Sequence, residues 1–185
     1  MTVLAVVGLS GVGKTTAINR LADKVPFLHL QASALIQAER VARGYAGTSS
    51  EDLRRGPVLD NQSLLICGFR RASEDHHGLV VLDGHVLIDS DNGMIKIPSS
   101  VFGDIGCDHI AVLTDDPHEI WQRRRNDVSR KRPSRSVQDL NEQQELICIV
   151  AAQIAGELGI HITEHSSSDG SLMELIFGMA NRGAV

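Results

Sequence analysis

The sequence predicts an α/β fold in which a five-stranded parallel sheet carries helices on both faces. The chain has 185 residues, of which 42% are hydrophobic and 22% are charged, values typical of one globular domain. Apolar runs alternate with amphipathic stretches along the whole length. Most of these runs are continuous, as expected of strands that are covered on both faces. We therefore treat residues 1–185 as a single domain.

Five apolar runs bounded by turn residues are the expected strands. In chain order they are residues 3–7, 27–30, 79–82, 110–113 and 160–163. Apolar side chains at helical spacing mark the helices between and after them: Ile18, Leu21 and Val25; Leu65, Ile66 and Phe69; Ile147, Val150, Ile154 and Leu158; and Leu172, Leu175, Ile176 and Met179. Strands that alternate with helices in this way form parallel pairs joined by crossovers.

The stretch GLSGVGKTT, residues 8–16, follows the first expected strand and precedes the first helical stripe. It matches the pattern G-x-x-x-x-G-K-[ST] at every position and in the required strand–turn–helix context. Glycines let the backbone curl so that successive N–H groups converge on a phosphate, and the helix adds its positive end. We expect ATP and Mg²⁺ to bind here, with Lys14 on the phosphates and the Thr15 hydroxyl on the metal. The predicted binding residues are Gly8, Ser10, Gly11, Val12, Gly13, Lys14, Thr15 and Thr16.

A second expected strand ends in a carboxylate. Residues 78–85 read GLVVLDGH, in which four apolar residues lead to Asp83. Such a strand is typical of phosphotransferases in which the aspartate organises Mg²⁺ through water. Because the carboxyl ends of parallel strands share one edge, Asp83 should lie beside residues 8–16. The alternative is an aspartate that only begins a turn. For His85, substrate contact and a structural role are both open.

A basic segment follows the fourth expected strand. Seven Lys or Arg residues lie within residues 123–135 of a protein whose net charge is −5. Asp116 is expected to cap a helix there, with Pro117 in its first turn and Glu119 completing a capping-box-like arrangement. That role makes Asp115 and Asp116 structural residues and not metal ligands.

We interpret residues 123–137 as a lid over the phosphates. Its arginines, in particular Arg124, Arg130 and Arg132, would stabilise the transferring phosphoryl group and exclude water. One alternative is a solvated helix face with an Arg123–Asp127 pair. The other is a nucleic-acid patch, which the aromatic content of 3% disfavours.

An insertion between the second and third strands is the expected acceptor arm, over about residues 31–75. It contains the stretch SEDLRRGP, residues 50–57. Arg54 or Arg55 would hold an acceptor's phosphate in a bidentate fork. Surface arginines at a helix end would give the same pattern.

Composition limits the partners and the compartment. The acidic net charge argues against nucleic acid or an anionic membrane as a partner. Cys67, Cys107 and Cys148 form no CxxC pair and are expected to be buried thiols of a reducing compartment. The first apolar run is too short to span a membrane and lacks the basic flank of a signal peptide. These features predict a cytoplasmic protein.

In this order the motifs resemble the adenylate kinases of archaeal type, within the nucleoside monophosphate kinase branch of P-loop proteins. The resemblance covers most of the chain and rests on GLSGVGKTT, on DGH after the third strand, on IDSDNGMIKIPSSVFGDI, on the basic lid with the following NEQQ, and on GIHITEH. It implies a three-layer P-loop NTPase fold, ATP and Mg²⁺ as cofactors, and transfer of the γ-phosphoryl group to a nucleoside monophosphate, AMP first among the candidates.

The resemblance also implies roles for single residues. Arg54 or Arg55 would meet the monophosphate, and Asp83 would lie near the metal and the acceptor. Residues 165–168, which include His165 and Ser166, would lie along the adenine of ATP. Relatives in this family are often trimeric, so a homo-oligomer is compatible with the resemblance, although no exposed apolar stripe assigns an interface.

Three departures from the family pattern leave the acceptor open. The family usually has DTH where this chain has DGH, an acidic residue where Pro133 and Ser134 follow Arg132, and an Asn-Arg pair near residues 145–148. One alternative is a kinase of an alcohol or sugar, with Asp83 as the base that takes a hydroxyl proton. Another is a switch protein that binds ATP without catalysing transfer.

Overall fold

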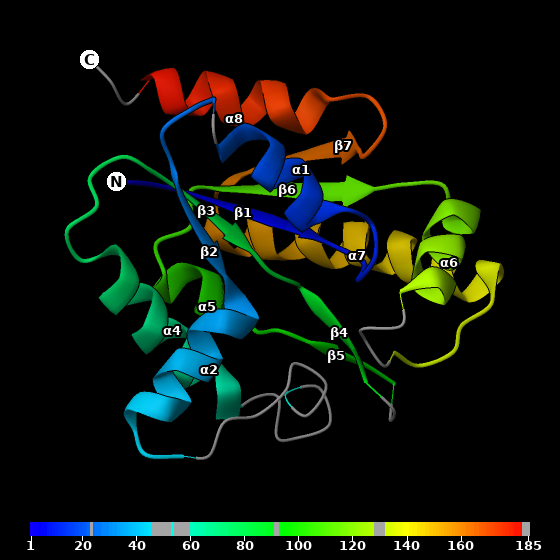
Figure 1. Cartoon of the computed structure of the whole chain (residues 1–185), viewed down its shortest axis with the longest axis horizontal. Coiled ribbons are helices and arrows are strands. Elements are labelled where there is room, and N and C mark those ends of the chain that lie inside the picture. The colour runs from blue at the N-terminus through cyan, green and yellow to red at the C-terminus, as the bar shows by residue number, and fades with distance from the viewer. Residues whose placement is uncertain (23, 46–52, 54–59, 91–92, 128–131, 183–185) are drawn as a thin grey trace.

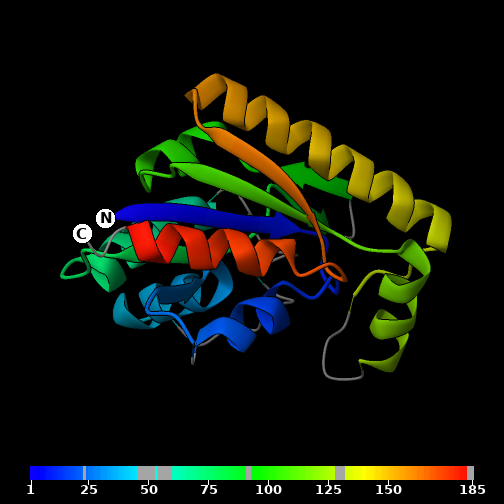
Figure 2. The same ribbon diagram turned by 90° about the horizontal axis from the view of Figure 1, so that it is seen from above.

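The computed structural model describes residues 1–22, 24–45, 53, 60–90, 93–127 and 132–182. Its main sheet consists of the five predicted strands, all parallel, in the order β2-β3-β1-β6-β7. They are β1 (Thr2–Gly8), β2 (Leu28–Gln31), β3 (Leu79–Asp83), β6 (His109–Thr114) and β7 (His161–Ser166). Helices lie on both faces of this sheet, which gives three layers (Figures 1 and 2). The predicted fold class is therefore confirmed.

The continuous apolar runs are the centre of the sheet. Residues 3–7 of β1 are at most 1% exposed, because β1 has a strand on each side and helices above and below. At the edge, β7 is less covered: His161 and Glu164 are exposed, and the other residues of the strand are only partly buried. Burial on both faces thus explains why β1 contains almost no polar residue.

Helices α1 (Lys14–Ala22) and α8 (Ser171–Arg182) pack together on one face of the sheet, and α5 (Ser99–Asp104) and α7 (Val137–Leu158) cover the other (Figure 2). Helix α6 (Pro117–Asn126) begins as predicted, with the Asp116 carboxylate accepting from the backbone N–H groups of His118 and Glu119. A complete capping box starts α7, where the side chains of Ser136 and Asp139 each accept from the other's backbone N–H. None of the described helices is long and apolar enough to cross a membrane.

Helix α2 and a hairpin were not among the sequence predictions. Helix α2 (Ala32–Ala42) packs against α4 (Asp60–Ser73), the helix predicted from Leu65, Ile66 and Phe69, and both helices lie within the expected acceptor arm. A hairpin of β4 (Leu87–Ser90) and β5 (Gly93–Lys96) follows β3 directly and forms a small antiparallel sheet of its own (Figure 1). Both features border the open edge of the main sheet, where the candidate site lies.

Candidate functional site

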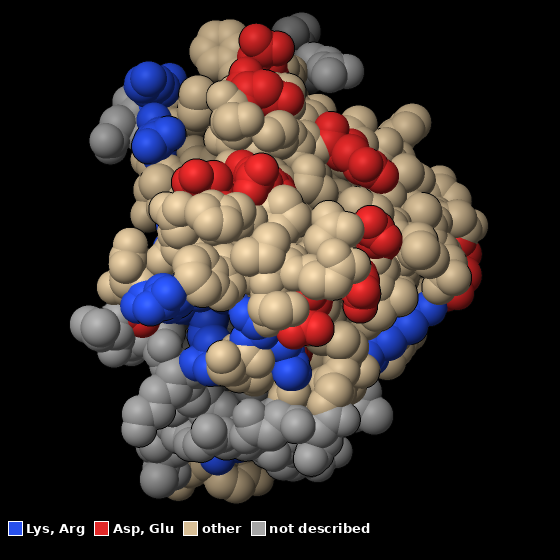
Figure 3. Space-filling view, turned by 90° about the vertical axis from the view of Figure 1, so that its right-hand side faces the viewer, with Lys and Arg blue, Asp and Glu red and all other residues tan. Residues whose placement is uncertain are grey.

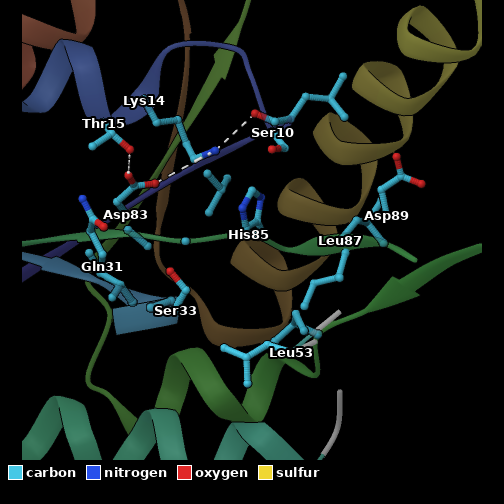
Figure 4. A pocket seen from close by; sticks show the side chains of 18 of the residues that line it. Ser10, Lys14, Thr15, Gln31, Ser33, Leu53, Asp83, His85, Leu87 and Asp89 are labelled. Carbon is cyan, nitrogen blue, oxygen red and sulfur yellow. Dashed lines mark hydrogen bonds and ion pairs between the residues drawn. The ribbon is translucent and has the colours of Figure 1, made fainter. Parts of the chain in front are cut away.

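A cavity of about 470 Å³ opens at the carboxyl edge of the main sheet. One end is formed by the P-loop, residues 8–16, together with the last residue of β3. The other end is formed by α2, α4, the β4–β5 hairpin and α5. Figure 4 shows labelled side chains from the P-loop, the end of β3, α2 and β4 around the same space. The predicted phosphate-binding and acceptor-binding regions therefore share one cavity.

The P-loop has the backbone geometry that its glycines predict. Gly11 and Gly13 have φ angles of 91° and 107°, a region that side-chain-bearing residues rarely occupy. At Gly8 the reason is close packing, since an added Cβ would lie 2.4 Å from the carbonyl oxygen of Leu113 on β6. The curled loop is thus possible only with glycine at these positions.

Lys14 is buried at the mouth of this loop. Its side chain is 6% exposed, and its ammonium donates to the carbonyl oxygens of Gly8 and Leu9 at 3.1 and 3.2 Å. The Lys14 Nζ atom also lies 4.0 Å from Asp83 Oδ1. The positive charge is therefore held beside the loop by one carboxylate and two carbonyls, within reach of a bound phosphate.

Thr15 and Asp83, the two residues predicted for Mg²⁺, lie together. Thr15 Oγ1 donates to Asp83 Oδ2 at 2.5 Å, across the gap between α1 and the end of β3 (Figure 4). A hydroxyl and a carboxylate are the hard oxygen ligands that Mg²⁺ prefers, with phosphate and water completing its shell. The residues present at this edge therefore fit the metal that the motif implies.

His85 contacts the P-loop in this structure. Its Nδ1 atom lies 2.9 Å from the Gly8 carbonyl oxygen, the same oxygen that accepts from Lys14. This contact is the structural role that was left open for His85, although the ring also lines the cavity (Figure 4).

Two of the three predicted lid arginines lie on the P-loop. Arg124 Nε donates to the Ser10 carbonyl oxygen at 2.8 Å, and Arg132 Nε donates to Ser10 Oγ at 3.1 Å. Arg132 also pairs with Asp127 at 2.6 Å. The third predicted residue, Arg130, lies outside the described residues. Figure 3, which faces the α6 side of the molecule, shows basic side chains gathered in this region.

Arg123 is a site residue that the sequence analysis did not assign. Its Nη1 atom donates to the carbonyl oxygens of Gly11 and Val12 at 3.2 and 3.1 Å, and its Nη2 atom bonds to the Asp115 carboxylate. Arg123 forms an ion pair with Asp115, and Arg132 forms one with Asp127. The Arg123–Asp127 pair that helical spacing suggested is therefore replaced by two other pairs. Helical spacing carries no signal for the pair with Asp115, which lies before the helix begins.

Asp115 joins three segments next to the P-loop. Its carboxylate accepts from Arg123 on α6 and from Ser167 Oγ, which follows β7. The side-chain amide of Gln144 on α7 pairs with the Asp115 backbone at 3.0 and 2.9 Å. Burial alone would raise the pKa of Asp115, but the hydrogen bonds from Ser167 and Arg123 outweigh it and hold that pKa below its usual value.

In the predicted adenine loop, His165 lies within hydrogen-bond distance of hydroxyl groups on β7 and α8. His165 Nε2 lies 2.8 Å from Thr163 Oγ1, and His165 Nδ1 lies 2.8 Å from Ser171 Oγ. Burial lowers the pKa of His165, which favours the neutral ring. Ser166 Oγ lies 2.8 Å from Ser168 Oγ. The contact between this loop and the base of α6 is made by Ser167, which neighbours the two predicted residues.

The end of the cavity opposite the P-loop, here called the acceptor end after the arm predicted there, is mainly apolar. Its apolar side chains come from four separate segments and include Ile36, Leu65, Leu87, Ile97, Val101 and Phe102. Polar lining groups at this end are Gln31, Ser33, Asn61, Gln62 and Asp89. Arg54 and Arg55, predicted to hold the acceptor's phosphate, lie outside the described residues, while Leu53 beside them lines the cavity. The part of this wall on α2 and α4 lies within the predicted acceptor arm, whereas no sequence pattern assigned the part on the hairpin and α5, which follow that arm in the chain.

A family model described as an AAA domain matches residues 7–141. The chain belongs to this family. Its curated relatives include an adenylate kinase from Pyrobaculum aerophilum, 24% identical over 169 residues that cover 86% of this chain and 82% of the relative. Another is an adenylate kinase from Pyrococcus abyssi, 28% identical over 149 residues that cover 78% of this chain and 75% of the relative.

Solved structures share the fold at lower identity. A sugar kinase from a Janibacter species superposes with a TM-score of 0.56 at 18% identity, covering 100% of this chain and 99% of that one. A gluconokinase from Sinorhizobium meliloti superposes with a TM-score of 0.53 at 14% identity. The match covers 98% of this chain and 92% of the gluconokinase. By sequence and fold, the chain is a P-loop kinase domain of the adenylate kinase type.

Proposed function

We propose that this protein transfers the γ-phosphoryl group of Mg·ATP to a nucleoside monophosphate, AMP first among the candidates. The observation that carries the proposal is one cavity with a complete P-loop, the Thr15–Asp83 pair and lid arginines at one end, and a mainly apolar wall at the other. Two substrates that bind at opposite ends of such a cavity would meet at Lys14 and Asp83. The similarity to archaeal adenylate kinases supports the same reaction.

The chain's own groups would act by position and charge. Backbone N–H groups of the P-loop and the Lys14 ammonium would hold the triphosphate, and Arg124 and Arg132 would face the moving phosphoryl group from the lid side. Charge spreads over the equatorial oxygens of that group during transfer, so donors fixed in advance lower the barrier. Bound Mg²⁺ would supply further charge neutralisation beside Thr15 and Asp83. Direct transfer needs no covalent intermediate with the protein.

The acceptor would occupy the apolar end. A volume of about 470 Å³ lies in the range of small-molecule sites, and apolar surfaces from α4, α5 and the hairpin suit the two faces of a nucleobase. Under this proposal Arg54 or Arg55 binds the acceptor's phosphate, and His165 and Ser166 lie along the adenine of ATP. We further expect a cytoplasmic protein without a nucleic-acid partner, able to form a homo-oligomer.

A kinase of an alcohol or sugar is the second candidate. Among the described lining residues, Lys and Arg occur only at the P-loop and lid, whereas Asp83 and Asp89 contribute carboxylates. A carboxylate at the junction of the two ends is suited to accept a proton from a hydroxyl acceptor. A switch that binds ATP without transfer is the third.

One experiment separates these functions. Purified protein is mixed with Mg·ATP and, in turn, with each nucleoside monophosphate and a panel of sugars and sugar acids, while ADP is measured. Turnover that depends on a monophosphate and is lost in Lys14→Ala supports the proposal. Turnover with a sugar alone would replace it by the second candidate. Saturable ATP binding without acceptor-dependent turnover would identify a switch.

A further inference from the structure

Asp89 on β4 is a buried carboxylate at the border between the acceptor end of the cavity and the lid arginines. Its side chain is 9% exposed and lines the cavity, with Leu87 and Ile88 before it on the same strand. No sequence pattern predicts a role for this residue. A charge at this depth requires compensation, so its partners indicate what it does.

Two arginines from different elements face Asp89. Arg135, just before α7, donates to Asp89 Oδ1 through Nη2 at 2.8 Å and through Nε at 3.3 Å. Arg124 on α6 places its Nη1 atom 3.7 Å from Asp89 Oδ2, with only 8% of its side chain exposed. Asp89 therefore joins the end of α6 and the start of α7 to the hairpin.

Arg124 connects this cluster to the P-loop. Its Nε atom donates to the Ser10 carbonyl oxygen, and its Cγ atom would lie 3.1 Å from a Cβ added to Gly11. The guanidinium thus lies over the crest of the loop, with Asp89 on its far side. At 3.7 Å, Asp89 attracts the guanidinium without a close hydrogen bond, and Asp89 Oδ2 accepts no hydrogen bond among the described residues. Asp89 and the Ser10 carbonyl oxygen therefore face Arg124 from two sides.

We propose that Asp89 is a positioning residue that holds Arg124 over the P-loop from the acceptor side of the cavity. The inference rests on the proposed phosphoryl transfer. Arg135 saturates one carboxylate oxygen and orients the other toward Arg124. An acceptor that enters the cavity would meet the residue that sets the position of the lid arginine.

A double-mutant cycle between Asp89→Asn and Arg124→Gln tests the proposal. If Asp89 acts through Arg124, D89N lowers kcat about tenfold in the wild-type background. This loss is smaller than the loss expected when a donor that stabilises the transition state is removed altogether, because Arg124 is still present. In the R124Q background D89N changes kcat less than about twofold, because no guanidinium is left to position. Equal factors in both backgrounds, no change in kcat, or an effect only on the acceptor's KM would each overturn the proposal.

A second buried carboxylate is the matched control. Glu39 on α2 is 3% exposed and pairs with Arg43 at 2.9 Å and Arg71 at 3.1 Å, away from the cavity lining. Glu39→Gln makes the same chemical change between two arginines. It should lower the melting temperature, and any change it makes in kcat should be the same in the wild-type and R124Q backgrounds, which separates positioning from a general loss of stability.

Binding measured without turnover separates this proposal from the proposed function. The same cycle is repeated by calorimetry with a non-hydrolysable ATP analogue and Mg²⁺. D89N should weaken the affinity about threefold in the wild-type background and leave it unchanged in R124Q, as coupling between the two residues requires. If the wild type binds the analogue but phosphorylates no acceptor, the proposed function fails while this cycle still tests Asp89. Equal weakening in both backgrounds would reject Asp89 as the residue that positions Arg124.

Discussion

The two ends of the cavity are built in different ways. The phosphate end is one continuous stretch, residues 8–16, whose backbone conformation depends on glycines within it. The acceptor end is assembled from side chains of α2, α4, the hairpin and α5, which are separate segments within residues 32–104. A site made from local backbone is visible in the sequence as a pattern. A site made from side chains of separate segments is not.

The largest expected effect is at the phosphate end. Lys14→Ala should lower kcat about 10³-fold, because it removes a buried charge aimed at the phosphates. Lys24→Ala, an exposed change beyond the same helix, is the control and should leave kcat unchanged. Steady-state kinetics with circular dichroism as a check of folding would measure this. Retention of activity in folded K14A would remove the basis for the proposed role of the P-loop.

The next effect concerns two neighbouring lid arginines. Arg123→Gln should lower kcat/KM for ATP about 10- to 100-fold, because Arg123 holds two P-loop carbonyls and Asp115 together. Arg125→Gln should change it less than about twofold, since Arg125 is exposed and lies over the Trp121 ring at 4.6 Å. Similar losses in both variants would show that the segment acts only through its net charge.

A smaller and more selective effect is expected at the acceptor end. Ser33→Leu adds volume to the cavity wall and should raise the acceptor's KM about tenfold, with the KM for ATP within about twofold. Ala34→Leu, on an exposed position of the same helix, is the matched control. If S33L instead raises the KM for ATP, the assignment of the two ends is reversed.

The smallest effect is a pH dependence of stability at Asp115, whose carboxylate contacts both Ser167 after β7 and Arg123 on α6. A carboxyl whose pKa is lowered in the folded state stabilises the fold above its unfolded pKa, about 3.9. This stabilisation is lost as the pH falls through the folded value. Asp115→Asn should therefore lower the melting temperature at pH 7, and its difference from wild type should shrink as the pH falls below about 4. A difference that stays constant down to pH 3 would contradict the lowered pKa.

The sequence predictions succeeded where the signal is local. All five strands lie where apolar runs predicted them, and the Asp116 cap begins α6 as expected. Thr15 and Asp83 lie together because parallel strands end at one edge of the sheet. The hairpin was missed, since four-residue strands such as LIDS and GMIK give too short a pattern to separate from a loop.

By itself, the sequence determined the α/β fold and the phosphate-binding loop, because hydrophobic spacing and glycine conformation act over a few neighbouring residues. Only the tertiary structure decided that Arg123 holds the P-loop carbonyls and that Asp89 faces Arg124 from the hairpin. The residues of these pairs lie 35 to more than 100 positions apart in the chain. The sequence also does not distinguish which of the adjacent arginines, residues 123–125, forms which contact. The tertiary structure selects among them, because α6 packs against α7 and so brings Arg123 to the P-loop and Arg124 to the hairpin.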